Sequence, residues 1–246
     1  IHEPNNMKAI EDKKANLFRL AKEHGFKTFY ISAQSGAFLT NLGPEFIDYK
    51  LFRQKELLLF NKYQDEALLK IIPNLDYAKQ NFIVINQRNA HAPYEENYQH
   101  NPAFKRFLPD RINYQQFRVD SYDNAMLYND YLIYEMIQFY KNKFTGPTYI
   151  IFTSDHGEVL DSSKVAFGHA DLKEEVAEVP FLAYVKNANI DEIKSISTPI
   201  FHYEIGHLIT KILGFEIHNP NKKDGIFYIH GTELNGNNEF IEYNKK

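Results

Sequence analysis

The sequence predicts an α/β fold in which a mostly parallel β-sheet is sandwiched between helices. Helical segments alternate along the chain with short apolar runs of the kind that form buried parallel strands. The 246 residues, 43% of them hydrophobic, can bury a large core, and no linker or internal repeat divides them. We therefore expect a single domain over residues 1–246, with ligands bound at the carboxyl ends of the strands.

In the first part of the chain, three predicted helices are each followed by a predicted strand. Helical spacing of apolar residues, a Gly or Pro break, and a β-branched or aromatic run mark each pair. The pairs are Leu17 to the stop at Gly25 with strand Lys27–Ala33, Asp65–Ile72 with strand Phe82–Asn86, and about Asp123 to Lys143 with strand Thr148–Thr153.

The remainder of the chain predicts three further strands and one amphipathic helix. Asp123 is expected to cap the long helix before them. The later elements are strand Phe181–Val185, a helix from about Thr198 to Leu213, strand Gly225–His230 and an edge strand Glu239–Tyr243.

Composition excludes several classes of protein. The formal net charge is −4, whereas nucleic-acid-binding domains are usually basic, so we expect no nucleic-acid partner. No stretch approaches the roughly 18 to 20 apolar residues that a membrane helix needs, and the first residues do not form a signal peptide, so the chain as given is expected to be soluble. The absence of Cys excludes disulfides and thiolate metal sites but leaves the compartment open.

The strongest chemical signal is the run Ser154-Asp155-His156-Gly157-Glu158, directly after the strand ending at Thr153. A carboxylate and an imidazole at the mouth of a strand suit zinc (Zn2+), and Gly157 allows the backbone to turn sharply beside a metal. By itself the pair is also compatible with a capped turn that carries an ordinary surface histidine. Glu158 is either a carboxylate that orients His156 or an exposed acid.

Two other histidines lie in loops that a parallel sheet would bring to the same edge. His169 follows His156 by thirteen residues, and His91 follows the strand ending at Asn86. Each alone could be a solvent-exposed loop histidine, but three on one rim would form a site. His202 and His207 are five residues apart on one predicted helix and do not share a face, so they are not expected to form a zinc pair.

The motifs, taken in order, resemble those of phosphoethanolamine transferases, which belong to the alkaline phosphatase and sulfatase superfamily. The run SDHGE, the later Gly-His pair and the Val-Pro before a strand resemble the carboxyl-terminal part of that family. Four more blocks agree in order: Leu17–Gln34, Tyr63–Leu69, Val84–Tyr98 and Tyr122–Tyr131. The resemblance implies an alkaline phosphatase/sulfatase-like fold.

Residue by residue, the resemblance implies that Asp155 and His156 bind the catalytic zinc. It also implies that His91 and His169 contact the phosphoryl group or a second zinc. Ala90 and Ala92 depart from the family pattern, which usually has Ser and Gly beside the first histidine.

The family's nucleophile is expected to be absent from this polypeptide. The family uses a Glu and a nucleophilic Thr that both precede the segment resembling Leu17–Gln34, and His2-Glu3-Pro4 does not form the expected elbow. Thr28 and Thr40 are not expected to replace that Thr. The fragment alone is therefore expected to be inactive and to hold zinc weakly.

The resemblance implies transfer of phosphoethanolamine from phosphatidylethanolamine to lipid A or another surface glycan. It also implies a location at the periplasmic face of the bacterial inner membrane, anchored by an amino-terminal transmembrane region that this chain lacks. The alternatives are a sulfatase or phosphoglycerol transferase of the same fold, or a degenerate non-catalytic domain. The basic and aromatic run Phe104–Arg111 is either a lipid-headgroup contact or a solvated loop with buried rings.

Overall fold

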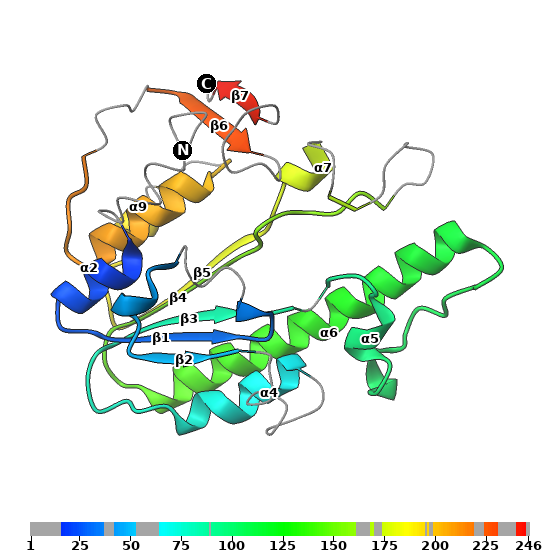
Figure 1. Ribbon diagram of the computed structural model, residues 1–246, viewed down its shortest axis with the longest axis horizontal. Coiled ribbons are helices and arrows are strands. Elements are labelled where there is room, and N and C mark those ends of the chain that lie inside the picture. The colour runs from blue at the N-terminus through cyan, green and yellow to red at the C-terminus, as the bar shows by residue number, and fades with distance from the viewer. Residues whose placement is uncertain are drawn as a thin grey trace. The chain divides into compact units, whose positions relative to one another are not determined.

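The structure, a computed structural model, describes residues 16–36, 42–52, 64–88, 90–160, 168–169, 174–194, 196, 199–218, 224–230 and 240–244. It contains two compact units, named here after a strand in each (Figure 1). The β3 unit comprises Phe26–Thr40 and Ile47–Thr148, and the β4 unit comprises Ile1–Gly25, Asn41–Phe46 and Tyr149–Lys246. The expectation of one domain stays a prediction.

The β3 unit is built on a parallel sheet with the strand order β2-β1-β3. Its strands are β1 (Lys27–Ser32), β2 (Tyr49–Leu51) and β3 (Asn81–Asn86). Both outer strands run parallel to β1, and Tyr30 lies opposite Lys50 and Val84. The strands predicted over Lys27–Ala33 and Phe82–Asn86 are thus confirmed. The short β2, whose first two residues are exposed, was not predicted.

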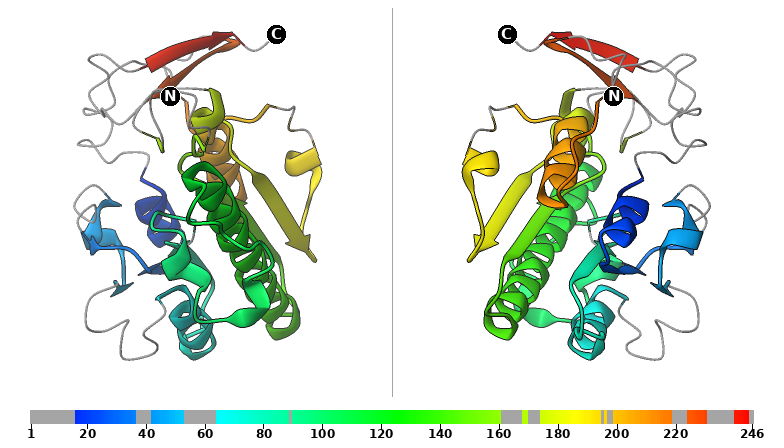
Figure 2. Two further views of the ribbon diagram at one scale, coloured as in Figure 1. Left: turned by 90° about the vertical axis from the view of Figure 1, so that its right-hand side faces the viewer. Right: turned by 90° about the vertical axis from the view of Figure 1, so that its left-hand side faces the viewer.

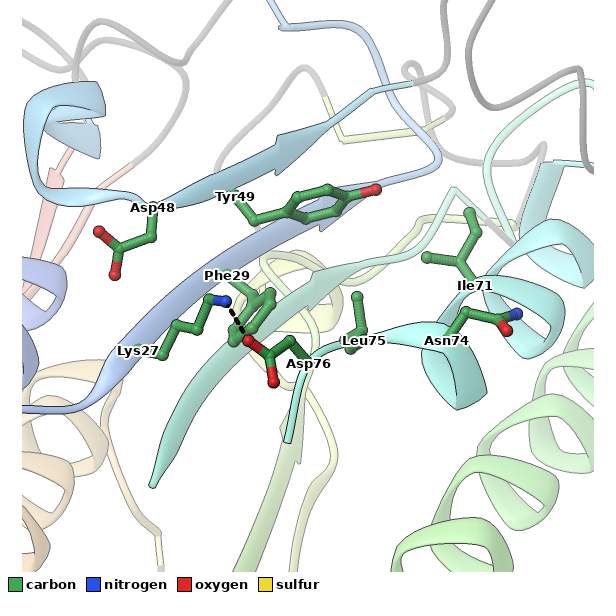
Figure 3. A pocket seen from close by; sticks show the side chains of 8 residues that line it. All are labelled: Lys27, Phe29, Asp48, Tyr49, Ile71, Asn74, Leu75 and Asp76. Carbon is green, nitrogen blue, oxygen red and sulfur yellow. Dashed lines mark hydrogen bonds and ion pairs between the residues drawn. The ribbon is translucent and has the colours of Figure 1, made fainter. Parts of the chain in front are cut away.

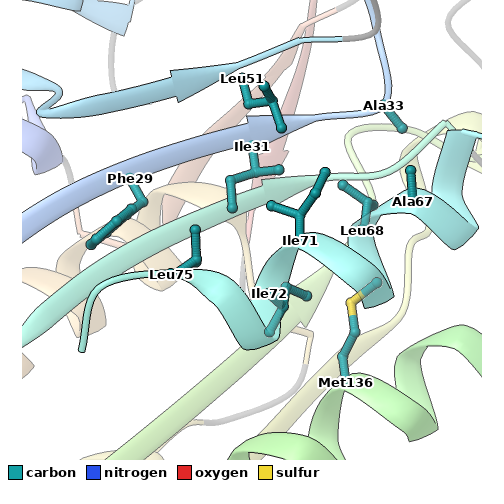
Figure 4. Packing of buried hydrophobic residues seen from close by; sticks show 10 residues of the cluster. All are labelled: Phe29, Ile31, Ala33, Leu51, Ala67, Leu68, Ile71, Ile72, Leu75 and Met136. Carbon is teal, nitrogen blue, oxygen red and sulfur yellow. The ribbon is translucent and has the colours of Figure 1, made fainter. Parts of the chain in front are cut away.

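Helices α4 (Gln64–Ile71) and α6 (Tyr114–Lys143) lie on one face of this sheet (Figure 1). Alternate residues of β1 face them, because successive side chains of a strand point to opposite faces. The resulting core contains Phe29, Ile31, Ala33, Leu51, Ala67, Leu68, Ile71, Ile72, Leu75 and Met136 (Figure 4). The intervening Thr28 is also buried, and its hydroxyl donates to Asp48 Oδ2 at 3.1 Å.

Helix α6 begins at Tyr114, well before the expected start near Asp123. The side chain of Asn113 accepts a hydrogen bond from Gln116 N and so caps the helix there. The prediction that Asp123 caps the helix is wrong. Asp123 lies in the helix interior, where burial and the neighbouring Asp120 raise the pKa of its carboxyl.

Shorter helical elements complete the β3 unit. Pro73 ends α4 by turning it into the 3-10 segment η3, which covers Ile72–Asn74. Between β3 and α6 the chain forms α5 (Glu95–Tyr98) and the 3-10 segment η4 (Pro102–Phe104).

The β4 unit contains the strand pair β4 and β5 and a separate antiparallel ribbon of β6 and β7 (Figure 2). Helices α2 and α9 contact each other, and the ring of His24 stacks on Phe215 at 4.2 Å. Phe201 stacks on Phe227 of the ribbon, also at 4.2 Å. The elements are α2 (Leu17–Glu23), η2 (Pro44–Phe46), β4 (Thr148–Thr153), α7 (Glu174–Ala177), β5 (Phe181–Lys186), α8 (Asp191–Lys194), α9 (His202–Ile212), β6 (Ile226–His230) and β7 (Phe240–Asn244).

The parallel sheet and its helices confirm the α/β class. Among the described residues, no helix combines the length and the apolar character required to cross a bilayer.

The packing of α4 against the sheet predicts the effect of truncating Leu68, which is fully buried. We expect Leu68→Ala to lower the free energy of unfolding by about 2–5 kcal/mol, because the cavity cannot refill completely. Leu108→Ala is the matched control, since Leu108 is 82% exposed and should change stability little. Urea denaturation followed by circular dichroism measures both, and equal effects would contradict the described core.

Candidate metal centre

The loop Ser154–Glu158 leaves the carboxyl end of β4 as a compact polar turn. Ser154 Oγ donates to His156 O at 2.8 Å, and Asp155 Oδ1 accepts from His156 N at 3.1 Å. These bonds fix the backbone on both sides of Asp155, whose own side chain is 79% exposed. The turn therefore presents a carboxylate and an imidazole to solvent at the end of a strand.

The imidazole of His156 is oriented by its own loop. Its Nδ1 lies 2.9 Å from Gly157 O. A carbonyl oxygen only accepts hydrogen bonds, so this contact assigns the proton to Nδ1 and the lone pair to Nε2. Asp155 Oδ2 lies 3.8 Å from that Nε2. A carboxylate oxygen and an imidazole lone pair thus lie side by side.

Gly157 is required because the loop passes close to the backbone of α7. Gly157 N donates to Val176 O at 2.8 Å. A Cβ at residue 157 would lie 2.1 Å from Glu175 O and 3.1 Å from Glu178 O. No side chain larger than hydrogen fits without moving the backbone, so close packing against α7, rather than the sharp turn expected from the sequence, is the reason that the structure gives for Gly157.

A small antiparallel bridge returns the chain to this loop. Val159 N donates to Gly168 O at 2.9 Å, and Gly168 N donates to Val159 O at 3.0 Å. Gly168 has a φ of +80°, the left-handed conformation that Gly adopts readily. The bridge places the next residue, His169, against His156, with ring centroids 3.9 Å apart.

Glu158 contacts the second histidine. Its Oε1 lies 2.9 Å from His169 Nδ1, and its side chain is only 9% exposed. Of the two roles expected for Glu158, the exposed acid is wrong, orienting His156 stays a prediction, and the structure adds a contact with His169. The contact between Glu158 and His169 depends on the pairing of residues 159 and 168, and no local sequence pattern indicates that pairing.

His156, Glu158 and His169 form a group that could hold a metal ion, with one donor atom from each lying within 4.8 Å of the others. Nitrogen and carboxylate donors fit zinc, which accepts His and Asp or Glu ligands. The group allows two arrangements. Either all three residues are ligands, or Asp155 and His156 are ligands while Glu158 holds the ring of His169.

His91 lies in the β3 unit, in the loop after β3, and its side chain is exposed. Its Nδ1 lies 2.6 Å from Ala92 O, so the proton again lies on Nδ1 and the lone pair on Nε2. Asn97 Nδ2 donates to His91 O at 3.0 Å, and Arg88 Nη1 donates to Asn97 Oδ1 at 3.2 Å. The loop therefore has internal support, although Ala90 adopts a φ of +62°.

The structure brings Asp155, His156 and His169 together in the β4 unit. His91 belongs to the other unit, so the expectation of one rim with four groups stays a prediction, as do the four assigned roles. Within the described chain, the metal-binding group does not include His202 or His207. His202 Nε2 instead lies 3.3 Å from Thr153 Oγ1. Thr40 and residues 2–4, which were considered for the nucleophile region, lie outside the described residues.

A cavity of about 260 Å³ lies in the β3 unit (Figure 3). His91 follows the carboxyl end of β3, whereas the lining of the cavity includes the amino-terminal ends of β1 and β2 and the turn after α4. Lys27 Nζ pairs with Asp76 at 2.6 Å beside it, and this hydrogen bond lowers the pKa of the Asp76 carboxyl. Ligands of parallel α/β sheets bind at carboxyl ends, so the cavity is not the candidate site.

Comparison with known proteins identifies transferases as relatives. The chain is 27% identical over 225 residues to phosphoethanolamine transferase EptA of Helicobacter pylori, an alignment covering 84% of the chain and 42% of that protein. It is 25% identical to phosphoethanolamine transferase EptC of two Escherichia coli strains, O18:K1:H7 and K12, with 58% of the chain and 26% of each protein covered. The chain thus spans less than half the length of these relatives. No solved structure matches it.

These relatives confirm the resemblance to phosphoethanolamine transferases. The family profile described as Sulfatase matches residues 2–215, which include the β1–β3 sheet, the loop after β4 and helix α9. This match and the parallel sheet with its helices confirm the sulfatase-like fold. The chain belongs to the sulfatase family.

Proposed function

We propose that this chain forms part of the active site of a zinc-dependent phosphoethanolamine transferase. The observation that carries the proposal is the cluster of His156, Glu158 and His169 after β4, in a chain of the sulfatase family whose relatives are named phosphoethanolamine transferases. The donor would be phosphatidylethanolamine, and the acceptor lipid A or another surface glycan. The site would work at the periplasmic face of the bacterial inner membrane, with the whole protein attached to that membrane.

The donor chemistry of the loop favours Asp155 and His156 as zinc ligands. The lone pair on His156 Nε2 and the Asp155 carboxylate lie 3.8 Å apart, close to the separation of two ligands on one small ion. Zinc held there would supply a Lewis acid that activates a hydroxyl nucleophile and neutralises charge on phosphoryl oxygens. Asp155 is exposed, so it can adjust its position without disturbing the core.

His169 and His91 are suited to contacting the phosphoryl group. Glu158 holds Nδ1 of His169, which leaves Nε2 as the atom directed toward a ligand. His91 also has its proton on Nδ1, which faces Ala92 O, so its Nε2 is likewise the atom available to a ligand. Imidazoles fixed in this way can donate, when protonated, to oxygens whose charge grows as phosphorus is attacked.

The resemblance to phosphoethanolamine transferases implies a two-step transfer. A hydroxyl nucleophile would displace diacylglycerol from the donor, and the acceptor would then take phosphoethanolamine from the phosphoenzyme. We expect the 246-residue polypeptide alone to show no transfer, because the resemblance assigns the nucleophile to a segment before Leu17. A sulfatase is the alternative within the family, and release of sulfate from an aryl sulfate by a longer form would support it.

Zinc titration tests the ligand assignment. We expect the isolated polypeptide to bind zinc more weakly than nanomolar, because only part of a four-ligand site is assigned to it. Asp155→Asn and His156→Ala should each lower the affinity about tenfold or more, whereas Asp191→Asn, at another exposed aspartate, should not. Calorimetry that gives nanomolar zinc binding, or equal affinities for all three variants, would contradict the assignment.

Glu158 variants separate a metal ligand from a positioning residue. Glu158→Gln keeps an oxygen that can accept from His169 Nδ1, while Glu158→Ala removes it. We expect Glu158→Gln to change zinc affinity little and to keep His169 in its assigned tautomer, as read from imidazole nitrogen chemical shifts. Glu158→Ala should lose that tautomer preference.

Glu23→Gln, at an exposed glutamate in α2, is the control for charge removal. If Glu158→Gln lowers zinc affinity as strongly as His156→Ala does, Glu158 is itself a ligand.

The close passage beside α7 predicts that Gly157→Ala displaces the whole loop. The added methyl group would overlap Glu175 O, so the loop must shift and its donor atoms must separate. We expect zinc affinity to fall by about tenfold or more, as when groups that support ligands are lost. Gly146→Ala is the control, because a Cβ there meets no atom within 4 Å. Unchanged zinc binding in Gly157→Ala would show that the loop has a different conformation.

A further inference from the structure

The segment from Lys105 to Tyr114, called the ridge below, exposes an unusual amount of apolar surface. It connects η4 to the amino-terminal end of α6 (Figure 1). Within ten residues, Phe107 is 43% exposed, Leu108 82%, Ile112 97% and Tyr114 59%. Scattered exposed apolar residues are ordinary, but four in one short segment mark an interaction surface. The sequence allowed a solvated loop with buried rings over Phe104–Arg111, but the ring of Phe104 is only partly buried and that of Phe107 is exposed.

The ridge is also positively charged. Lys105, Arg106 and Arg111 are exposed and Asp110 is its only acid, giving a formal charge of +2 from three cations and one anion. The whole chain has a formal net charge of −4, so the ridge is a positively charged segment in an acidic protein. Cations beside exposed apolar side chains match the phosphates and the acyl boundary of an anionic bilayer.

Contacts at both ends hold the ridge in place. The buried side chain of Asn124 makes two hydrogen bonds to the backbone of Phe107. Its Nδ2 donates to Phe107 O at 2.8 Å, and its Oδ1 accepts from Phe107 N at 3.0 Å. The ring of Phe104 packs between Tyr128 and Tyr131, with centroids 4.8 and 5.2 Å away.

At the far end of the ridge, Asp110 Oδ1 accepts from Ile112 N at 2.8 Å, and Asn113 caps α6. The apolar side chains are therefore presented by a fixed backbone, which lowers the entropic cost of inserting them.

We propose that the ridge is a membrane-contacting surface that inserts Leu108 and Ile112 into the interface of an anionic phospholipid bilayer. Side chains that are 82% and 97% exposed have almost no neighbours among the described residues of the β3 unit. Such protruding side chains suit a deformable bilayer better than a preformed protein groove. Lys105, Arg106 and Arg111 would lie at the phosphates, and Tyr114 at the headgroup level, where Tyr is enriched. This binding does not depend on the proposed transferase activity.

The chain contains no Trp, so one introduced indole reports on a single position. In the full 246-residue chain, Leu108→Trp or Ile112→Trp should show blue-shifted emission with equimolar phosphatidylcholine and phosphatidylglycerol vesicles, and quenching by brominated acyl chains. Leu182→Trp is the matched control, at an exposed leucine of β5, and should show neither change. These lipids contain no ethanolamine, so the result is separate from any donor recognition.

Vesicle cosedimentation of the Trp-free chain gives the second readout. We expect the double variant Leu108→Ser and Ile112→Ser to lower partitioning about tenfold or more, because the inserted apolar area is lost. Reversing Lys105, Arg106 and Arg111 to Glu should abolish the preference for phosphatidylglycerol. Both variants alter exposed side chains, and unchanged thermal melting confirms that they fold.

Three outcomes would overturn the inference. They are no vesicle binding by the parent chain, equal binding by the parent and the Ser double variant, and concentration-dependent self-association that the same double variant removes. The last result, seen by sedimentation velocity, would show that the ridge joins two copies of the chain instead.

Discussion

The candidate metal centre depends on the two backbone hydrogen bonds between Val159 and Gly168. They close the loop that separates His156 from His169 and set the two rings 3.9 Å apart. Two bonds alone are a weak closure, since each contributes only about 1 kcal/mol. The Glu158 contact with His169 adds a charge-assisted bond on the same side of the loop. The backbone pairing of Val159 with Gly168 therefore determines which side chains meet at this site.

The loop that carries His91 is held by a different means. Its main-chain groups bond to side chains, with Arg88 N donating to Asp65 Oδ1 and Asn97 Nδ2 to His91 O. Farther along, His100 Nε2 meets Glu66 Oε1 at 2.7 Å, and the Tyr128 hydroxyl donates to the same oxygen. Burial and the Glu66 carboxylate raise the pKa of Tyr128, so its hydroxyl stays a donor. These contacts fasten the chain on either side of His91 to α4 and α6.

Sequence patterns predicted the elements whose signal is local. The apolar runs of β1, β3 and β4 and the periodicity of α4 and α9 were each found within a few residues of their observed ends. The start of α6 was missed because Asn113, rather than the acidic Asp123, supplies the cap, and helix-compatible residues fill the turns between them. Asp155 and His156 stood out because a strand leads directly into them. Glu158 could not be assigned, since its partner His169 comes close only through a long-range bridge.

Metal binding and loop closure should support each other where all three residues of the group are ligands. His156 precedes and His169 follows the loop that residues 159 and 168 close, so an ion bound by both, with Glu158, would restrict that loop. An ion bound by Asp155 and His156 alone would not. An imidazole binds a metal through a nitrogen lone pair, and each of these stacked rings can offer one. The nearly buried Glu158 carboxylate would offset the positive charge of an ion bound beside the rings. In that three-ligand arrangement, linkage requires that whatever stabilises the bridge raises metal affinity, and that a bound metal stabilises the bridge by the same amount.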